Sequence, residues 1–260
     1  MEPCLDRKDD AGSGRPASSD PERGTTCLRP DARISAIVPV LDEEERIGTT
    51  LGRLAGVEGI LEVIVVDGGS RDATVAAASR AEGVVVLQAT RGRASQMNEG
   101  ARVARGDVLL FLHADVELPP RAGFAIAAAL SDREVVAGAF RTWTIDDVGA
   151  PRWLVPFLHL ADLRSRYSGL PYGDQAMFVR AEVFRELGGF PRVRLMEDLE
   201  MSRALRRRGR IRIVRESVRV SGRRFVRRPL YYLAIMNLLP LLHRLGIPPE
   251  RLARFYPHER

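Results

Sequence analysis

Charged side chains that follow four hydrophobic stretches are the residues of this sequence best suited to bind a charged ligand. Acids follow the first, second and fourth stretches and arginines the third: Asp42, Glu43, Glu44, Asp67, Arg91, Arg93, His113 and Asp115. Carboxylates accept hydrogen bonds from ribose, sugar or base groups, and arginines neutralise phosphate oxygens. The combination predicts a ligand that resembles a nucleotide or a nucleotide sugar. Taken singly, Glu43, Glu44 and Asp72 are better explained as helix caps or first-turn acids.

His113 and Asp115 have the spacing of a pair that holds a divalent cation. In an extended segment both side chains face the same way, and a cation between them would bridge two phosphates. That cation would draw charge from a departing diphosphate, so that a sugar leaves without being protonated. Imidazole suits Mn²⁺ better than Mg²⁺. The structural alternatives are a helix cap for Asp115 and a buried, hydrogen-bonded histidine for His113.

A further pair of acids, Glu197 and Asp198, stands at the start of a predicted helix in the second half of the chain. A carboxylate in that position can be a simple cap. The functional interpretation makes one of the two a general base, which takes a proton from an acceptor hydroxyl as that oxygen attacks.

Two more polar groups could complete such a site. Asp174, between Gly173 and Gln175, precedes an apolar strand and could meet a sugar or an acceptor, or lie in a polar turn. Arg223 and Arg224 follow Ser221 and a strand-like segment, and they could fold over a diphosphate because paired arginines bind phosphate strongly. A general excess of arginine is the alternative explanation.

Alternating strands and helices must position these side chains. Buried strands are predicted at 34–40, 61–67, 84–88 and 107–115, and helices at 41–56, 71–82, 93–106 and 119–130. A short helix is predicted at 181–191. Strands and helices that alternate with short connections build an α/β fold with a mostly parallel sheet and helices on both faces. Ligands of such sheets bind at the carboxyl ends of the strands.

The composition is that of a globular chain of 260 residues, with 45% hydrophobic residues. Residues 1–32 are rich in Gly, Pro, Ser and Asp and are predicted to be a disordered tail. Both cysteines, Cys4 and Cys27, lie in that tail, which excludes a disulfide framework. No run of about 18 apolar residues and no signal peptide is found, so a cytoplasmic location is expected.

The net charge of +6 is unevenly distributed. Residues 203–228 contain twelve arginines and a single acid, which makes them a candidate surface for phosphate or anionic lipid, unless a GC-rich coding sequence explains the arginines. The C-terminal segment, residues 229–260, begins with an uncharged stretch at 229–242. It is predicted to form a helical hairpin that packs on the domain, with Pro240 interrupting the uncharged stretch. The alternative is a segment lying in a membrane interface, with membrane association through residues 203–245.

Several nucleotide-binding and catalytic motifs are missing from the sequence. The first strand is not followed by G-x-G-x-x-G, and neither G-x-x-x-x-G-K-[ST] nor G-x-S-x-G occurs. These observations exclude a dinucleotide fingerprint, a P-loop and a nucleophile elbow.

Five ordered segments resemble the family-2 glycosyltransferases with the GT-A fold. They are VPVLDEEERI, VIVVDGGSRDAT, GRASQMNEGARVARGDVLLFLHAD, GGF and MEDLEMSRALRRRGR. The resemblance covers residues 33 to about 225 and implies a GT-A domain at 33–228. It also implies an inverting, hexosyltransferase-like enzyme that uses a nucleoside-diphosphate sugar and Mn²⁺ or Mg²⁺. The HAD, GDQAMF and SGRR segments look like a narrower bacterial subgroup.

The resemblance also implies a role for each matching residue. Asp42, Glu44 and Asp67 would bind the nucleoside, and Arg93 would lie near the phosphates. Asp115 matches the last Asp of the metal motif, and Asp198 matches the base. His113 departs from the family, which has Asp there, and Asp42 replaces the usual Asn. The Q-x-x-R-W motif of processive synthases is absent, so one sugar per encounter is expected.

The acceptor implied is an alcohol, with a lipid or polyprenyl phosphate as one form, and an anionic membrane surface is a further expected partner. Nucleic acid is not expected. Two alternatives stay open at this point. One is a sugar-phosphate nucleotidyltransferase, although the glycine-rich triphosphate loop that it needs is missing. The other is a nucleotide-binding or anion-binding module without catalysis, driven by residues 203–228.

Overall fold

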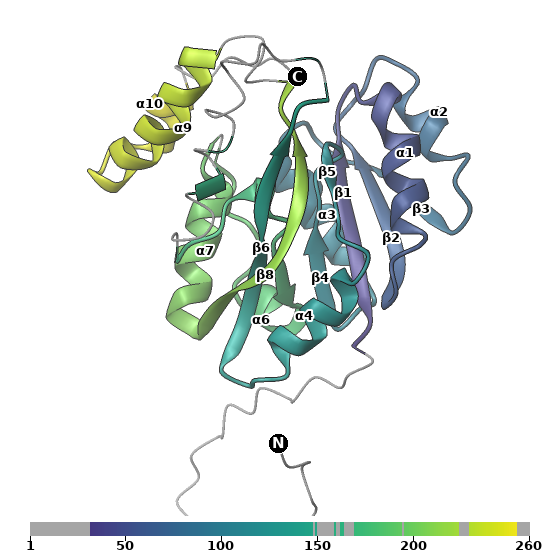
Figure 1. Cartoon of the computed structure of the whole chain (residues 1–260), viewed down its shortest axis with the longest axis horizontal. Coiled ribbons are helices and arrows are strands. Elements are labelled where there is room, and N and C mark those ends of the chain that lie inside the picture. Colours follow the sequence, from purple (N-terminus) through teal and green to yellow (C-terminus); the bar gives the residue numbers. More distant parts are fainter. Residues whose placement is uncertain are drawn as a thin grey trace, which may run out of the picture.

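The computed structural model describes residues 32–147, 149, 159, 162–163, 169–193, 195–223 and 229–253. These residues form an eight-stranded sheet with the strand order β3-β2-β1-β4-β7-β6-β8-β5 (Figure 1). The strands are β1 (Ile34–Val40), β2 (Ile60–Asp67), β3 (Val84–Gln88), β4 (Val108–Phe111), β5 (Val116–Glu117), β6 (Val135–Ile145), β7 (Phe178–Arg180) and β8 (Arg210–Ser221).

The first half of the sheet is parallel, as predicted. β1 pairs in parallel with β2 on one side and with β4 on the other, and β3 extends the sheet beyond β2. The strand order therefore reverses at β1, which is where open α/β sheets bind their ligands. β7 is antiparallel to both β4 and β6, whereas β6 and β8 are parallel and β5 closes the far edge antiparallel to β8.

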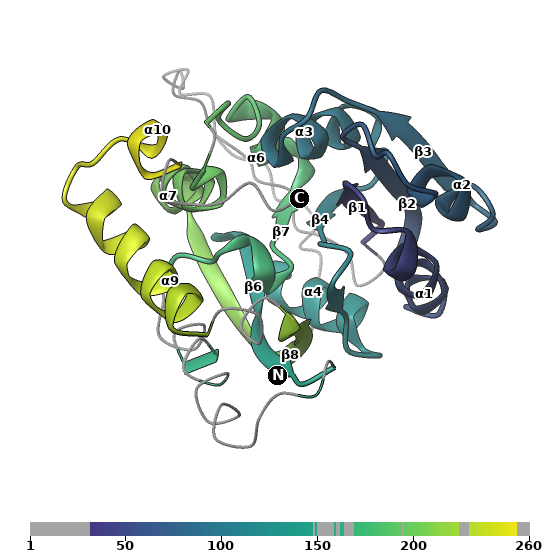
Figure 2. The same ribbon diagram turned by 90° about the horizontal axis from the view of Figure 1, so that it is seen from above.

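Helices cover both faces of the sheet (Figure 2). They are α1 (Glu44–Leu54), α2 (Thr74–Ala78), α3 (Arg93–Val103), α4 (Ala122–Leu130), α6 (Ala181–Glu186), α7 (Glu197–Arg208), α9 (Pro229–Arg244), α10 (Pro249–Leu252) and the short 3₁₀ helix η1 (Gly173–Gln175). One core cluster joins the sheet to α1, α2 and α4, and a second joins it to α3, α6 and α7. The predicted α/β fold with helices on both faces is confirmed.

The alternation of side chains along β1 explains the two cores. Ala36 and Val38 belong to the first cluster, whereas Ile37, between them, belongs to the second. Successive residues of a strand point to opposite faces, so a strand between two helix layers must be apolar throughout. On α1, the buried residues Ile47, Leu51 and Leu54 form the predicted apolar face.

The long strands β6 and β8 were not predicted from the sequence, apart from the four residues SVRV of β8. β8 was missed because its arginines belong to residues 203–228, which were interpreted as a ligand-binding surface. Within residues 203–228, six arginines instead form ion pairs with acids of other segments or the same helix: Arg203, Arg208, Arg210, Arg212, Arg219 and Arg223. Much of the positive charge in this segment is therefore compensated within the fold.

The C-terminal helix α9 packs beside α7. Ile235 and Leu239 of α9 are buried with Met196 and Leu199, and Leu252 of α10 joins the same cluster. The prediction that Pro240 interrupts the segment is wrong, because α9 continues through it to Arg244. A proline costs a helix one backbone hydrogen bond, which tertiary packing can offset. None of the described helices is both long and apolar enough to cross a bilayer.

Two predicted features fall on residues outside the described ranges. Apart from Ala32, the predicted disordered tail of residues 1–32 lies there. So does Arg224, one of the predicted diphosphate ligands.

Candidate active site

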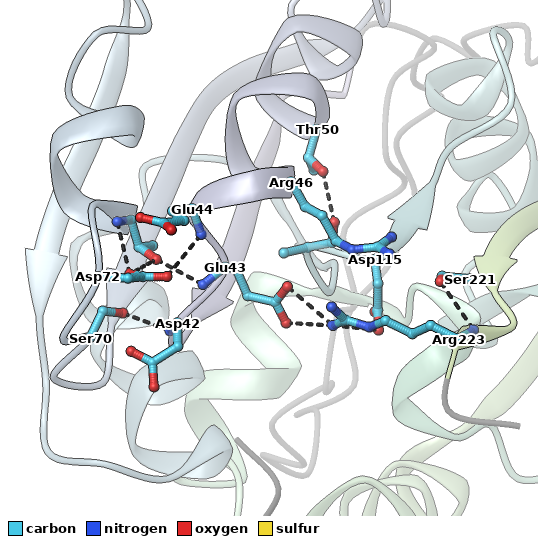
Figure 3. Close-up of polar contacts among 12 residues, drawn as sticks. Asp42, Glu43, Glu44, Arg46, Thr50, Ser70, Asp72, Asp115, Ser221 and Arg223 are labelled. Carbon is cyan, nitrogen blue, oxygen red and sulfur yellow. Dashed lines mark hydrogen bonds and ion pairs between the residues drawn. The ribbon is translucent and has the colours of Figure 1, made fainter. Parts of the chain in front are cut away.

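The candidate site lies at the edge of the sheet where β1, β2 and β4 end. Because these strands are parallel, the loops that follow Val40, Asp67 and Phe111 share one edge. α1 begins after the first loop and α2 after the second, and the last residues of β8 reach the same region (Figure 3).

The loops after β1 and β2 are held together by reciprocal hydrogen bonds between carboxylates and backbone. The Asp42 N–H donates to Ser70 Oγ (2.9 Å), and the Arg71 N–H donates to Asp42 Oδ1 (2.8 Å). The Ala73 N–H donates to Glu44 Oε2 (2.8 Å), and the Glu44 N–H donates to Asp72 (3.1 Å). The exposed acids Asp42 and Glu44 are thereby fixed in place.

Asp67 organises the loop that follows its own strand. It is 1% exposed, and its carboxylate accepts from the backbone N–H groups of Gly69 (3.0 Å) and Ser70 (3.1 Å). A buried carboxylate needs such donors, because it has lost its water. Asp67 therefore fixes the loop that carries the backbone partners of Asp42.

Glu43 reaches across the fold instead of capping α1. It stands at the N-cap position, but its side chain makes no capping hydrogen bond. Arg223, just past β8, donates from Nη2 to both carboxylate oxygens of Glu43, at 2.8 and 3.1 Å (Figure 3). The same nitrogen lies 3.5 Å from Oδ2 of Asp115. Nothing in the sequence indicates a contact between residues so far apart, and Glu43 takes the predicted N-cap position without a capping hydrogen bond from its side chain.

A second arginine and a third acid border this cluster. Arg46 forms an ion pair with Asp147 (3.1 Å), and the Ser221 hydroxyl donates to the same carboxylate (2.7 Å). Burial alone would raise the pKa of Asp147, but these partners bring it below its usual value. Ser221 directly precedes the segment of the predicted ligands Arg223 and Arg224. Arg46 and Asp147 were given no role, although Arg46 lies within the VPVLDEEERI segment.

His113 and Asp115 do not lie in an extended segment, as the sequence interpretation assumed. β4 ends at Phe111, and the Val116 N–H donates to the His113 carbonyl oxygen (3.1 Å), so residues 113–116 form a turn. Asp115 faces Arg223, and its side chain is 11% exposed. His113 is buried and faces a different group, described next.

His113 and Asp198 converge on Gly173. A Cβ at Gly173 would lie 2.9 Å from Nε2 of His113 and 3.3 Å from Oδ2 of Asp198. The Gly173 N–H donates to that same oxygen of Asp198 (2.7 Å), while the Leu199 N–H donates to Oδ1 (2.7 Å). The first residues of η1 and α7 therefore place the Asp198 carboxylate beside His113. Asp174, the next residue of η1, lies at the same corner of the site.

Glu197 has a different neighbour from Asp198. Its side chain is 3% exposed, and Oε1 lies 2.7 Å from Nε of Arg93, the first residue of α3. The ion pair holds the guanidinium of Arg93 near the start of α7. Of the two predicted base candidates, the geometry thus favours Asp198, because Glu197 already pairs with a positive charge.

Three sets of contacts, joined by residues that are neighbours along the chain, link the predicted site residues in one path. Asp67 connects through Ser70 to Asp42, Glu43 connects through Arg223 to Asp115, and His113 connects at Gly173 to Asp198. Within the described part of the chain, no three His, Cys, Asp or Glu side chains are grouped as a ready metal site. Arg223 places a positively charged nitrogen between the carboxylates of Glu43 and Asp115, so this position already accommodates a cationic group.

Comparisons with solved structures identify the fold. A mannosyltransferase from Pyrobaculum calidifontis, solved with GDP-Man and Mn²⁺, superposes with a TM-score of 0.60 at 20% identity, over 86% of this chain and 68% of that one. S. aureus TarS in complex with UDP-GlcNAc gives a TM-score of 0.58 at 17% identity, over 86% of this chain and 70% of that one. The architecture is the GT-A glycosyltransferase fold.

Sequence comparisons identify the family. The model of glycosyl transferase family 2 matches residues 35–188, and the chain belongs to this family. An undecaprenyl-phosphate 4-deoxy-4-formamido-L-arabinose transferase from Pseudomonas fluorescens is 29% identical over 57% of this chain and 46% of that protein. A dodecaprenyl-phosphate galacturonate synthase from Rhizobium johnstonii is 29% identical over 45% and 38%. The chain spans less than half the length of these two relatives.

Proposed function

We propose that this protein is an inverting, non-processive glycosyltransferase that moves a sugar from a nucleoside-diphosphate sugar to an acceptor hydroxyl with the help of a divalent cation. The observation that carries the proposal is the path of contacts from Asp42 to Asp198, which joins carboxylates suited to a nucleoside, arginines suited to a diphosphate, and a separate carboxylate suited to a base. Membership in family 2 supports the same reaction class.

The donor would lie along this path. Asp42 and Glu44 would accept hydrogen bonds from the base and ribose, in loops that Asp67 holds in shape. Arg93, oriented by Glu197, and Arg223, oriented by Glu43, would contact the phosphates, with Arg224 as a further ligand. Asp174 would meet the donor sugar or the acceptor.

Asp115 would hold the divalent cation, either Mn²⁺ or Mg²⁺, whereas His113, the other predicted ligand, is directed by the turn toward Gly173 and Asp198. When bound, the cation supplies positive charge to the leaving diphosphate. The mannosyltransferase neighbour was solved with Mn²⁺.

Asp198 would act as the general base. As the acceptor oxygen attacks the anomeric carbon, its proton passes to Oδ2 of Asp198 and the bond from that carbon to the diphosphate oxygen breaks. A single displacement of this kind inverts the anomeric configuration. The hydrogen bonds from Gly173 and Leu199 keep the carboxylate in one orientation during the reaction.

A thermal-shift panel of nucleotide sugars, each with and without Mn²⁺, tests the donor proposal. A ligand that binds only the folded chain raises its melting temperature. At a ligand concentration a hundredfold above Kd, the free energy of unfolding increases by about 2.7 kcal/mol. The expected result is one nucleotide sugar whose stabilisation depends on Mn²⁺. Salt-sensitive binding of RNA, together with no response to any nucleotide sugar, would instead support an anion-binding module.

Gly173→Ala tests the position of the base without altering its charge. The new Cβ would crowd His113 and Asp198, while the backbone N–H that binds Asp198 is kept. Because small displacements of catalytic groups are costly, the turnover number is expected to fall about tenfold to a hundredfold. Gly169→Ala is the matched control, since a Cβ there meets nothing within 4 Å. Equal activity of the two variants would contradict the proposed arrangement.

We further propose that the acceptor is lipid-linked and that α9 lies against an anionic membrane. Leu238 and Leu241 of this helix form an exposed stripe with Leu245, the residue just past its end, and their exposures are 48%, 52% and 72%. No acid occurs from residue 217 to residue 249, whereas Arg227 and Arg228 precede the helix and Arg244 ends it. An apolar stripe flanked by arginines suits an interface with anionic head groups. The neighbouring face of α9, with Ile235 and Leu239, packs beside the start of α7, which carries Asp198.

Co-sedimentation with vesicles tests this surface. The chain is expected to bind vesicles rich in phosphatidylglycerol more strongly than phosphatidylcholine vesicles, and the triple variant with serine at 238, 241 and 245 should lose about tenfold or more in binding. The exposed Leu61, on β2, provides the control Leu61→Ser. If the triple variant binds as well as Leu61→Ser, the stripe is not the membrane-binding face.

A further inference from the structure

One nitrogen of Arg223 stands between two carboxylates that are both shielded from solvent. Its Nη2 lies 2.8 and 3.1 Å from the oxygens of Glu43, which is 8% exposed, and 3.5 Å from Asp115. The three side chains come from the β1–α1 loop, the turn after β4 and the residues after β8. The position of this nitrogen is therefore set by three segments that lie far apart along the chain.

Charge balance explains why Arg223 occupies this place. Two carboxylates at close range, one buried and one 11% exposed, repel each other and have lost much of their hydration, so a positive charge must accompany them. A guanidinium always carries its positive charge in a protein. Glu43 contributes the strongest contact with it, because both carboxylate oxygens take part.

The position that Arg223 takes is also the position proposed for the divalent cation. A cation on Asp115 would meet a guanidinium nitrogen only 3.5 Å from the same carboxylate, and like charges at this range repel strongly in a partly buried site. A diphosphate changes this balance, since it offers Arg223 oxygens of its own.

We propose that Arg223 is the resident cation of the Asp115 site, held there by Glu43, and that it gives up Asp115 to the metal only when a diphosphate accepts its guanidinium. This inference rests on the proposed function. It makes Glu43 a positioning residue, and it makes metal and diphosphate depend on each other for binding. Linkage requires that each then raises the affinity of the other by the same factor.

Mn²⁺ titrations followed by electron paramagnetic resonance, without nucleotide, test the inference directly. The wild-type chain should bind Mn²⁺ weakly. Arg223→Gln, which removes the resident charge, should bind Mn²⁺ at least about tenfold more tightly than the wild type. Arg223→Lys keeps a positive charge and should bind Mn²⁺ as weakly as the wild type. Arg219→Gln removes a charge from an exposed arginine of β8 that pairs with Glu117, and it should match the wild type.

Glu43→Gln distinguishes an electrostatic effect on Mn²⁺ binding from a disturbance of the local structure. This variant breaks the same Glu43–Arg223 pair, but it removes a negative charge, so Mn²⁺ should bind no more tightly than in the wild type. Opposite responses of the two variants are what electrostatic competition predicts, whereas a purely structural contact would weaken binding in both. The inference is overturned if Arg223→Gln binds Mn²⁺ no more tightly than Arg219→Gln.

Asp115→Asn, alone and in the Arg223→Gln background, distinguishes a failure of this inference from a failure of the proposed function. If Asp115→Asn abolishes Mn²⁺ binding while Arg223→Gln does not tighten it, only the resident-cation inference fails. If Mn²⁺ binding survives Asp115→Asn in both backgrounds, the metal role of Asp115 fails and the inference fails with it. Adding UDP or GDP to the wild type should tighten Mn²⁺ binding, and the enhancement should shrink in Arg223→Gln.

Discussion

Replacing Asp198 by asparagine is expected to reduce turnover by about a hundredfold to ten-thousandfold, the contribution of a general base. The amide has nearly the same shape and keeps an oxygen that can accept from the Gly173 N–H, so the local structure should persist. It has no negative charge to accept the proton of the attacking hydroxyl. Steady-state kinetics with the donor and acceptor identified by the thermal-shift panel measure the loss.

The donor affinity of this variant should stay within a few fold of the wild type, because Asp198 lies at the acceptor end of the contact path. Glu200→Gln is the matched control: Glu200 lies two residues further along α7 and pairs with Arg203 and His243. Its turnover should remain within a few fold of wild type. A fully active Asp198→Asn variant would remove this residue from the base role, and Glu197→Gln would become the next variant to examine.

Removal of the divalent cation is the second change with a large expected effect. Chelation with EDTA should reduce sugar transfer at least about a hundredfold, since the charge that the cation places on the leaving diphosphate is worth several kcal/mol. Added Mn²⁺ should restore the rate. Asp115→Asn should show a similar loss that Mn²⁺ no longer restores.

Glu117→Gln provides the control for Asp115, because it removes a carboxylate only two residues away. Glu117 pairs with Arg53 and Arg219, away from Arg223. It should keep both its activity and its response to Mn²⁺. Transfer that continues unchanged in EDTA would refute the role given to Asp115, and transfer restored by Mn²⁺ in Asp115→Asn would place the cation on other residues.

The neighbourhood of Asp115 shows why motif matching alone gives an incomplete site. His113 and Asp115 are one residue apart, yet a turn directs one toward Gly173 and the other toward Arg223. Similarly, Glu197 and Asp198 are adjacent but have different partners, Arg93 and Gly173. The sequence pattern singled out these four residues, and only the fold separated their contacts.

The strands β1 to β4, the helices between them and the edge where the polar residues gather follow from the sequence, because strand and helix periodicity and parallel connections are local signals. The β6–β8 pair, the Glu43–Arg223 bridge and the burial of α9 beside α7 were decided only by the tertiary structure. Each brings together segments far apart along the chain, and no local pattern records which distant partner a charged or apolar side chain will meet.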